Sequence, residues 1–453
     1  MQSELDDGRP SCGAASSNNC LGYTPPDLRY SDLSKQSASV GRRHIFYCPG
    51  YDPESRTRYR LLFVRELLRH AKCFGEAKPQ ISRASLSADG LVQSWTVTAV
   101  SASRDVETSY DVLLWDDIVV RDSARSRFVS VVLLVIGTLH ALIRGKLFTF
   151  YRLNWKYGNV ILYPFVLLML LGMITALVAL VVHAHLGDWY GYSLGLPPWA
   201  TIPLGMLAGL GWIRAMEAIL NRAFFWQILN DWVFNWQHGQ GRRPDYEARL
   251  DAFADHLVAR LAAFADVGET LDEILIVGHS TGGLTAVEVA ARLLVRDPEI
   301  GARGPVLSLA TLGSGLPLVA LQPQAARVRS DIASLVTSRR IAWIDYVAPQ
   351  DWMNFPRFNP LRDLDLPIVA GAPIVNPTIR SARFREILAE ETYRKVRLRP
   401  FRMHFQFLMS NDRRGAYDFF AMTLGSSTLH QRGLADWAGL STGLALPCET
   451  LAA

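Results

Sequence analysis

The chain has 453 residues, of which 49% are hydrophobic and 20% are charged, and it carries a formal net charge of +5. This length is enough for one large domain or two modest ones, and a charged fraction below the soluble average favours a membrane-embedded portion. The mild positive charge and the lack of a nucleic-acid-binding motif exclude nucleic acid as an expected partner, whereas basic residues clustered beside apolar segments suit anionic lipid.

The amino-terminal segment, residues 1–38, is polar and begins with acidic residues. It contains neither the basic stretch nor the apolar stretch of a signal peptide, and its composition predicts a disordered tail. Residues 39–127 are expected to form the first part of an α/β domain. An apolar run ending in Pro49-Gly50 and the helical pattern Arg56–Phe74 predict a strand, a glycine turn and a helix, and two strand-like runs follow, "LVQSWTVTAVSA" and "TSYDVLLWDDIVV".

Residues 128–225 are expected to form a membrane-associated insertion with two spanning segments. The first, 160–182, is 23 residues without a charge, enough to cross a hydrocarbon core of roughly 30 Å. The second, 194–213, is also uncharged and carries a Gly205-x-x-x-Gly209 face suited to close helix contact. Together they predict a hairpin with a loop over residues 183–193, and two buried core helices are the alternative.

Basic residues flank both ends of this hairpin, and the loop at 183–193 contains no Lys or Arg. By the positive-inside rule both flanks face the cytoplasm. Four aromatic residues would then lie at the far interface: Trp189, Tyr190, Tyr192 and Trp199. The excess of arginine over lysine is typical of a GC-rich bacterial genome, so we expect a multi-pass protein of the cell inner membrane.

Two neighbouring stretches allow more than one interpretation. Phe128–Ile143 has only 16 residues, which is short for a span, so we expect a helix lying in or against the membrane. Arg214–Trp236 combines tryptophans with basic residues, a pattern typical of a membrane interface. Packing of the same aromatic rings in a globular core is an equal alternative.

Residues 226–435 are expected to form the second part of the α/β domain, and residues 436–453 a carboxy-terminal tail. A helical pattern in "YEARLDAFADHLVARLAAFA" precedes an apolar strand at Ile274–Val277, a helix to Leu294, and strands in "PVLSLATLGSGLPL" and "RRIAWIDYVAPQD". This alternation predicts a mostly parallel sheet with helices on both faces. Because strands from both sides of the insertion must meet in one sheet, an even number of membrane crossings is required.

The segment "IVGHSTGGLTA" places a serine between the predicted strand and the predicted helix. Gly278-His279-Ser280-Thr281-Gly282 matches G-x-S-x-G, in which the two glycines permit a sharp strand-to-helix turn that exposes the serine hydroxyl. The pattern alone is weak, but its position inside an α/β alternation is the context that a nucleophile elbow requires. An ordinary turn is the alternative.

A serine hydroxyl is a poor nucleophile and needs a base that a third group orients. His404, in an aromatic stretch, is the favoured base, and His430, in a polar stretch, is the alternative. Asp351, in the loop past a predicted strand, is the favoured acid, and Asp345, inside that strand, is the alternative.

The backbone N–H groups of Thr281 and Tyr51 are the candidate donors for an oxyanion hole. Thr281 follows the serine at the start of a helix, where N–H groups are unpaired. Tyr51 follows Gly50 in "YCPGYD", the loop after an early strand. A plain turn at Pro49-Gly50 is the alternative.

These residues resemble the α/β-hydrolase superfamily, in particular its lipase- and esterase-like serine hydrolases, with a transmembrane hairpin inserted. The resemblance covers roughly residues 42–125 and 225–430, and "GHSTGG" is similar to the elbow of lipases. It implies hydrolysis of carboxylic esters through an acyl-serine, without a metal or an organic cofactor. The departure is Pro49, where many members have a histidine.

Membrane attachment favours an amphiphilic or lipid-like ester as the substrate, with the lipid bilayer as the main partner. Thioester hydrolysis or acyl transfer by the same three side chains is one alternative. A membrane scaffold of hydrolase fold that has lost turnover is another, since fold alone does not establish activity.

Overall fold

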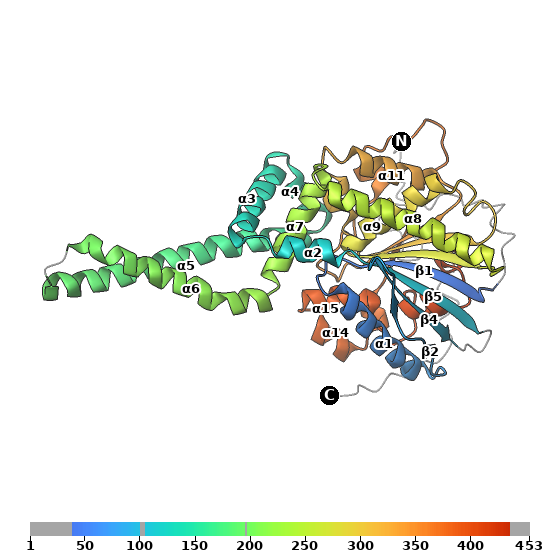
Figure 1. Ribbon diagram of the computed structural model, residues 1–453, viewed down its shortest axis with the longest axis horizontal. Helices are drawn as coiled ribbons and strands as arrows, with labels where there is room; N and C mark the ends of the chain where they lie inside the picture. Colours follow the sequence, from blue (N-terminus) through green and yellow to red (C-terminus); the bar gives the residue numbers. More distant parts are fainter. Residues whose placement is uncertain (1–38, 100–104, 195–196, 435–453) are drawn as a thin grey trace, which may run out of the picture.

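The computed structural model describes residues 39–99, 105–194 and 197–434. It is a mixed α/β structure with a mostly parallel sheet of nine strands, helices on both faces of the sheet, and two long helices that project away from it (Figure 1). The tails predicted for residues 1–38 and 436–453 lie outside the described residues.

The strand order in the sheet is β2-β4-β5-β1-β6-β7-β8-β9, with β3 also paired to β4. From β5 to β9 every neighbouring pair is parallel, whereas β4 is antiparallel to β5, β2 and β3. The strands are β1 (Arg42–Cys48), β2 (Gln80–Ile81), β3 (Ser85–Leu86), β4 (Val92–Ala99), β5 (Val106–Leu113), β6 (Glu273–His279), β7 (Val306–Leu312), β8 (Ala342–Val347) and β9 (Thr378–Ser381). Because β1 lies between β5 and β6, the segments before and after the insertion share one sheet, as the sequence predicted.

Side chains of the central strands alternate between two hydrophobic cores, one on each face of the sheet. Ile274 and Ile276 of β6 point into the first core, and Leu275 and Val277 point into the second. All residues of β6, β7 and β8 are buried, as expected for parallel strands covered on both faces.

Helices that follow the sheet strands cover both cores (Figure 1). The first core packs under α2 (Asp116–Ser123), α7 (Phe225–Gly239), α8 (Pro244–Asp266), α9 (Thr281–Arg296), α10 (Leu316–Ala320), α11 (Ala326–Thr337) and α12 (Pro360–Asp363). The second packs under α1 (Ser55–Phe74), α13 (Phe384–Ile387), α14 (Glu390–Val396), α15 (Pro400–Phe405), η3 (Gln406–Leu408), α16 (Phe419–Leu424) and α17 (Leu429–Leu434).

The projecting pair consists of α5 (Trp155–Leu194) and α6 (Ile202–Arg222), joined through the short helix η2 (Pro198–Thr201). Both helices are long and apolar enough to cross a membrane. The loop predicted at 183–193 is wrong, because the structure continues α5 through these residues. α5 ends at Leu194, shortly before Pro197 and Pro198, which cannot continue a helix, and the second candidate span begins at Trp199 rather than at residue 194.

The predicted close contact between the two long helices is confirmed at the glycines of α6. A Cβ atom on Gly205 would lie 2.6 Å from the carbonyl oxygen of Ala179, and one on Gly209 would lie 3.0 Å from Cγ2 of Thr175. Glycine is therefore needed at both positions for the backbones of α5 and α6 to approach each other.

The segment before the hairpin forms α3 (Arg127–Ile143) and α4 (Lys146–Leu153). One face of α3 is buried, and Gly137 packs against the ring of Trp236 on α7. Its other face exposes large apolar side chains, including Phe128 at 76% and Ile143 at 81%. Of the two interpretations for 214–236, core packing holds for α7, because Trp232 and Trp236 are buried.

Candidate active site

Ser280 lies at the turn between β6 and α9 with an unusual backbone conformation. Its φ of 60° and ψ of −129° place a non-glycine residue in a region that side chains rarely adopt, at a cost of about 1–3 kcal/mol. Hydrogen bonds hold this turn: the Ser280 N–H donates to the Leu312 carbonyl at 3.0 Å, and its carbonyl accepts from the N–H groups of Gly283 and Gly315 at 2.9 Å.

The two glycines of the G-x-S-x-G pattern make room for the turn. A Cβ on Gly282 would overlap the carbonyl oxygen of Cys48 at the end of β1, and one on Gly278 would overlap the carbonyl oxygen of Gly282. The strand, the turn and the following helix therefore pack so closely that only glycine fits at these positions.

His404 and Asp351 form a buried pair at the carboxyl edge of the sheet. The Nδ1 of His404, on α15, lies 2.7 Å from Oδ2 of Asp351, in the loop after β8, and both residues are buried. The Asp351 carboxylate also accepts hydrogen bonds from the backbone N–H of Met353 and from Nδ2 of Asn354, both at 2.9 Å. These donors fix the carboxylate, which in turn orients the imidazole ring.

The other ring nitrogen of His404, Nε2, is buried and is not used in a hydrogen bond among the described residues. Ser280 and His404 line the same small cavity of about 40 Å³. With its proton on Nδ1, toward Asp351, the imidazole keeps a free lone pair on Nε2. Such a nitrogen can accept a proton, and catalytic hydrogen bonds often shorten only when substrate is bound.

The structure places the two alternative residues away from this pair. Asp345 lies inside β8, where its Oδ1 accepts a hydrogen bond from Thr311 at 2.6 Å, and burial raises its pKa to about 6. His430 lies on α17 near Glu273, at the opposite end of β6 from the serine, and burial lowers its pKa. The structure thus brings together Ser280, His404 and Asp351.

Two backbone N–H groups lie near Ser280: that of Tyr51, in the loop after β1, and that of Thr281, at the start of α9. Gly50 lies so close that a Cβ there would be 3.1 Å from Cβ of Ser280, and its own N–H donates to the Tyr59 hydroxyl at 3.2 Å. The N–H groups of Tyr51 and Thr281 donate to no group in the described part of the chain. Tyr51 also lines the cavity, whereas Thr281 follows the serine at the start of α9.

Pro49 has a structural role in the same loop. Its carbonyl oxygen accepts a hydrogen bond from Nε1 of Trp115 at 3.0 Å. This contact ties the loop after β1 to the buried start of α2, and Pro49 is not among the residues that line the cavity.

Asp231, on α7, is a cavity residue that the sequence pattern did not reveal. Its Oδ1 accepts hydrogen bonds from Oγ1 of Thr281 at 2.9 Å and from Nδ2 of Asn235 at 3.0 Å. Burial raises its pKa to about 6, although these hydrogen bonds oppose the shift. The sequence contains one hint of this residue, because Asp231 is an acidic residue among the aromatic side chains of α7.

His279, the second residue of the elbow, also contributes to the site. Its Nε2 donates to the carbonyl oxygen of His404 at 3.2 Å, and the two rings lie 4.5 Å apart. Burial, and then the neighbouring His404, holds the pKa of His279 well below its usual range. A neutral imidazole at this position helps to position the helix that carries His404.

One group of potential metal ligands lies elsewhere in the described ranges, formed by His238, Glu247 and Glu288. Both carboxylate oxygens of Glu288 are within 3.1 Å of Nε2 of His238, and Arg327 pairs with Glu247 at 2.9 Å. These groups already bind one another or arginine, and their contacts link α7 to α8 and α9.

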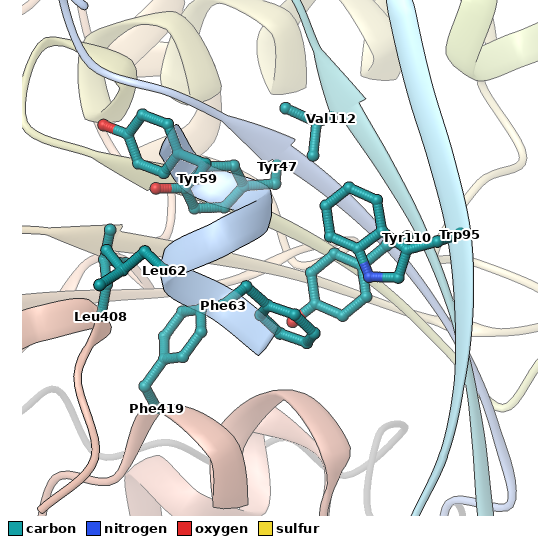
Figure 2. A pocket seen from close by; sticks show the side chains of 9 residues that line it. All are labelled: Tyr47, Tyr59, Leu62, Phe63, Trp95, Tyr110, Val112, Leu408 and Phe419. Atoms are coloured by element: carbon teal, nitrogen blue, oxygen red, sulfur yellow. The ribbon is translucent and has the colours of Figure 1, made fainter. Parts of the chain in front are cut away.

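Figure 2 shows a separate cavity of about 20 Å³ between α1 and the sheet. Aromatic and aliphatic side chains line it, including the stacked rings of Trp95 and Tyr110, 5.3 Å apart. No carboxylate, histidine, lysine or arginine of the described ranges lines it, and it is too small for an organic ligand. It therefore belongs to the packing of the second core.

No protein-family model, curated protein or solved structure matches this chain. Its function is therefore inferred from the geometry of the cavity around Ser280.

Proposed function

We propose that the chain is a membrane-anchored serine hydrolase that cleaves carboxylic esters through an acyl-serine intermediate. The observation that carries the proposal is the shared cavity of Ser280 and His404, in which Asp351 holds one ring nitrogen and the other is unpartnered. A strained serine at a strand-to-helix turn supports it, because such strain is typical of functional residues.

In the proposed reaction, Oγ of Ser280 attacks the ester carbonyl carbon while Nε2 of His404 takes the hydroxyl proton. The Asp351 carboxylate stabilises the imidazolium that forms. The N–H groups of Tyr51 and Thr281 donate to the oxyanion of the tetrahedral intermediate. The imidazolium then protonates the leaving alcohol. A water molecule, deprotonated by the same imidazole, releases the acid and regenerates the serine.

The sheet supports a resemblance to α/β-hydrolases of the lipase and esterase type. The serine follows the central strand β6, the acid follows β8, and the histidine comes after β9. Ligands of parallel sheets bind at this carboxyl edge, and the chain order serine, acid, histidine is that of the superfamily. No step of the proposed reaction uses a metal or a cofactor.

The two long helices support a location in the cell inner membrane. Their length and apolarity suit a hairpin anchor, and the basic residues on both flanks favour a catalytic domain that faces the cytoplasm. An anchored enzyme meets substrates at the bilayer surface, so we propose an amphiphilic, lipid-like ester as the substrate.

Labelling with a fluorophosphonate probe tests this proposal on the full chain in detergent. We expect the wild type to be labelled and Ser280→Ala to remain unlabelled. Ser334→Ala, which removes an exposed hydroxyl on α11, should be labelled like the wild type. Absence of labelling on folded wild-type protein would reject the enzyme and favour a scaffold. Product analysis with an ester, the matching thioester and an added alcohol then separates hydrolysis from acyl transfer.

A further inference from the structure

An apolar groove of about 610 Å³ lies where the long helices join the α/β domain. Its wall comes from α4, the first turns of α5, the junction of α6 and α7, the loop after β8, and α15. The cavity at Ser280 is only about 40 Å³, so it has no room for a whole lipid-like ester. The groove has the size typical of ligand sites, which is about 300–1,000 Å³.

We infer that this groove holds the acyl chain of a bilayer-borne ester while the ester carbonyl lies at Ser280. The inference rests on the proposed function and deepens it, because it names the part of the substrate that the enzyme recognises. It assigns specificity to the length of an aliphatic chain rather than to a polar head group.

The groove and the serine cavity are adjacent. Ile228, Met353 and Phe401 line both of them. Each belongs to an element that also carries a polar residue of the site: Asp231 on α7 and His404 on α15 line the cavity, and Asp351 in the loop after β8 binds His404. A chain lying in the groove would therefore end beside the histidine and the serine.

The other end of the groove lies on the first candidate span. Val160, Tyr163 and Val166 of α5 line it, and their spacing of three residues places them on one face of the helix. Val166 is 57% exposed and begins the apolar surface of α5. An acyl chain could therefore pass from a lipid leaflet to the serine cavity without crossing water.

A strained aromatic residue lies at the wall of this passage. Phe224, between α6 and α7, has a φ of 56°, and its ring lies 4.1 Å from that of Phe401. A non-glycine residue in the left-handed region is strained and persists where the surrounding structure requires it. Here the conformation turns the aromatic ring onto the groove, where it can pack against an aliphatic chain.

The surface beside the groove suits the plane of an anionic bilayer. Arg397, Arg399 and Arg402 are exposed, and Leu398 between them is 75% exposed. They flank Phe401, which lines the groove. Basic side chains combined with an exposed leucine are typical of a segment at a membrane interface. The charge and the apolar lining together favour a lipid over a soluble peptide.

Chain-length kinetics on the full protein in detergent test the inference. Each methylene that enters the groove should raise kcat/KM about fourfold, because burial of a methylene contributes about 0.8 kcal/mol. For the wild type we expect this rise from butanoyl to octanoyl esters. Ala223→Trp, which fills the groove, should reduce the rise to less than about twofold per methylene. Ala218→Trp, on an exposed position of α6 outside the groove, is the matched control.

A binding measurement keeps the inference separate from the proposed hydrolysis. A fatty-acid ester with a diazirine on its chain, photolysed in the Ser280→Ala protein, should crosslink within residues 160–166 or 223–228. Crosslinking there, combined with no fluorophosphonate labelling of the folded wild-type protein, would support the groove and reject the hydrolase. Crosslinking only elsewhere, or an unchanged chain-length dependence in Ala223→Trp, would overturn the inference while the hydrolase stands.

Discussion

Replacing Asp351 with asparagine should remove most turnover while the protein stays folded. The carboxylate receives hydrogen bonds on both oxygens, from Met353 on Oδ1 and from His404 and Asn354 on Oδ2. Asparagine has the same shape but only one acceptor oxygen. If that oxygen stays on the Met353 N–H, the new NH₂ group faces His404, which must then carry its proton on Nε2. That tautomer cannot accept the proton of Ser280.

The expected loss follows from this change of tautomer. When the acid of such a triad becomes an amide, kcat falls by about 10⁴, although the geometry is retained. At 1.36 kcal/mol for each factor of ten, this is about 5 kcal/mol of transition-state stabilisation. Stability should fall less, by about 1–3 kcal/mol, because a single buried hydrogen bond to Asn354 is left unsatisfied.

The assay is steady-state hydrolysis of a short chromogenic ester, with thermal unfolding in detergent as the test of folding. Asp345→Asn is the matched control, because it retains an acceptor oxygen for Thr311 and lies away from His404. It should keep turnover within about twofold of the wild type, since it touches no reacting group. The reasoning is refuted if Asp345→Asn is inactive, or if folded Asp351→Asn keeps more than a tenth of the wild-type rate.

Three further changes test the site, the helix hairpin and the topology. Burial raises the pKa of Asp231 from its ordinary 3.8 to about 6. The folded protein thus holds this proton more tightly than the unfolded chain, and stability falls as pH rises between these values. Asp231→Asn should therefore be more stable than the wild type above pH 6, by up to about 3 kcal/mol in the free energy of unfolding, and should lose this advantage near pH 4. Thermal unfolding across this pH range measures the difference, and parallel pH profiles of the two proteins would contradict the prediction. Gly205→Val should destabilise the hairpin by about 1–3 kcal/mol in thermal unfolding, because its Cβ would meet the backbone of Ala179. Gly211→Val is the control, since a Cβ there faces open space. Equal losses of stability in the two variants would argue against the helix contact. A reporter enzyme inserted at Gly191 should be active only outside the cytoplasm, and cytoplasmic activity would reject the proposed orientation.

Local patterns in the sequence were enough to predict the parts of the molecule that neighbouring residues determine. In a bilayer, the backbone polar groups of a long uncharged run can form their hydrogen bonds only within a helix, so the sequence was enough to predict both long helices. The turn at Ser280 was foreseen because Gly278 and Gly282 leave space that no other residue leaves. The mostly parallel sheet followed from alternating strand and helix patterns.

The tertiary structure decided which distant side chains meet. Asp345 lies in β8, and Asp351 lies in the loop after it. Because β8 ends at Val347, it is Asp351 that reaches His404, 53 residues later in the chain. Likewise, no local pattern predicted three other features: the contact of Asp231 with Thr281, the continuation of α5 through residues 183–194 and the groove beside Phe401. Periodicity reports which face of an element is buried, whereas these contacts depend on how separate elements pack against one another.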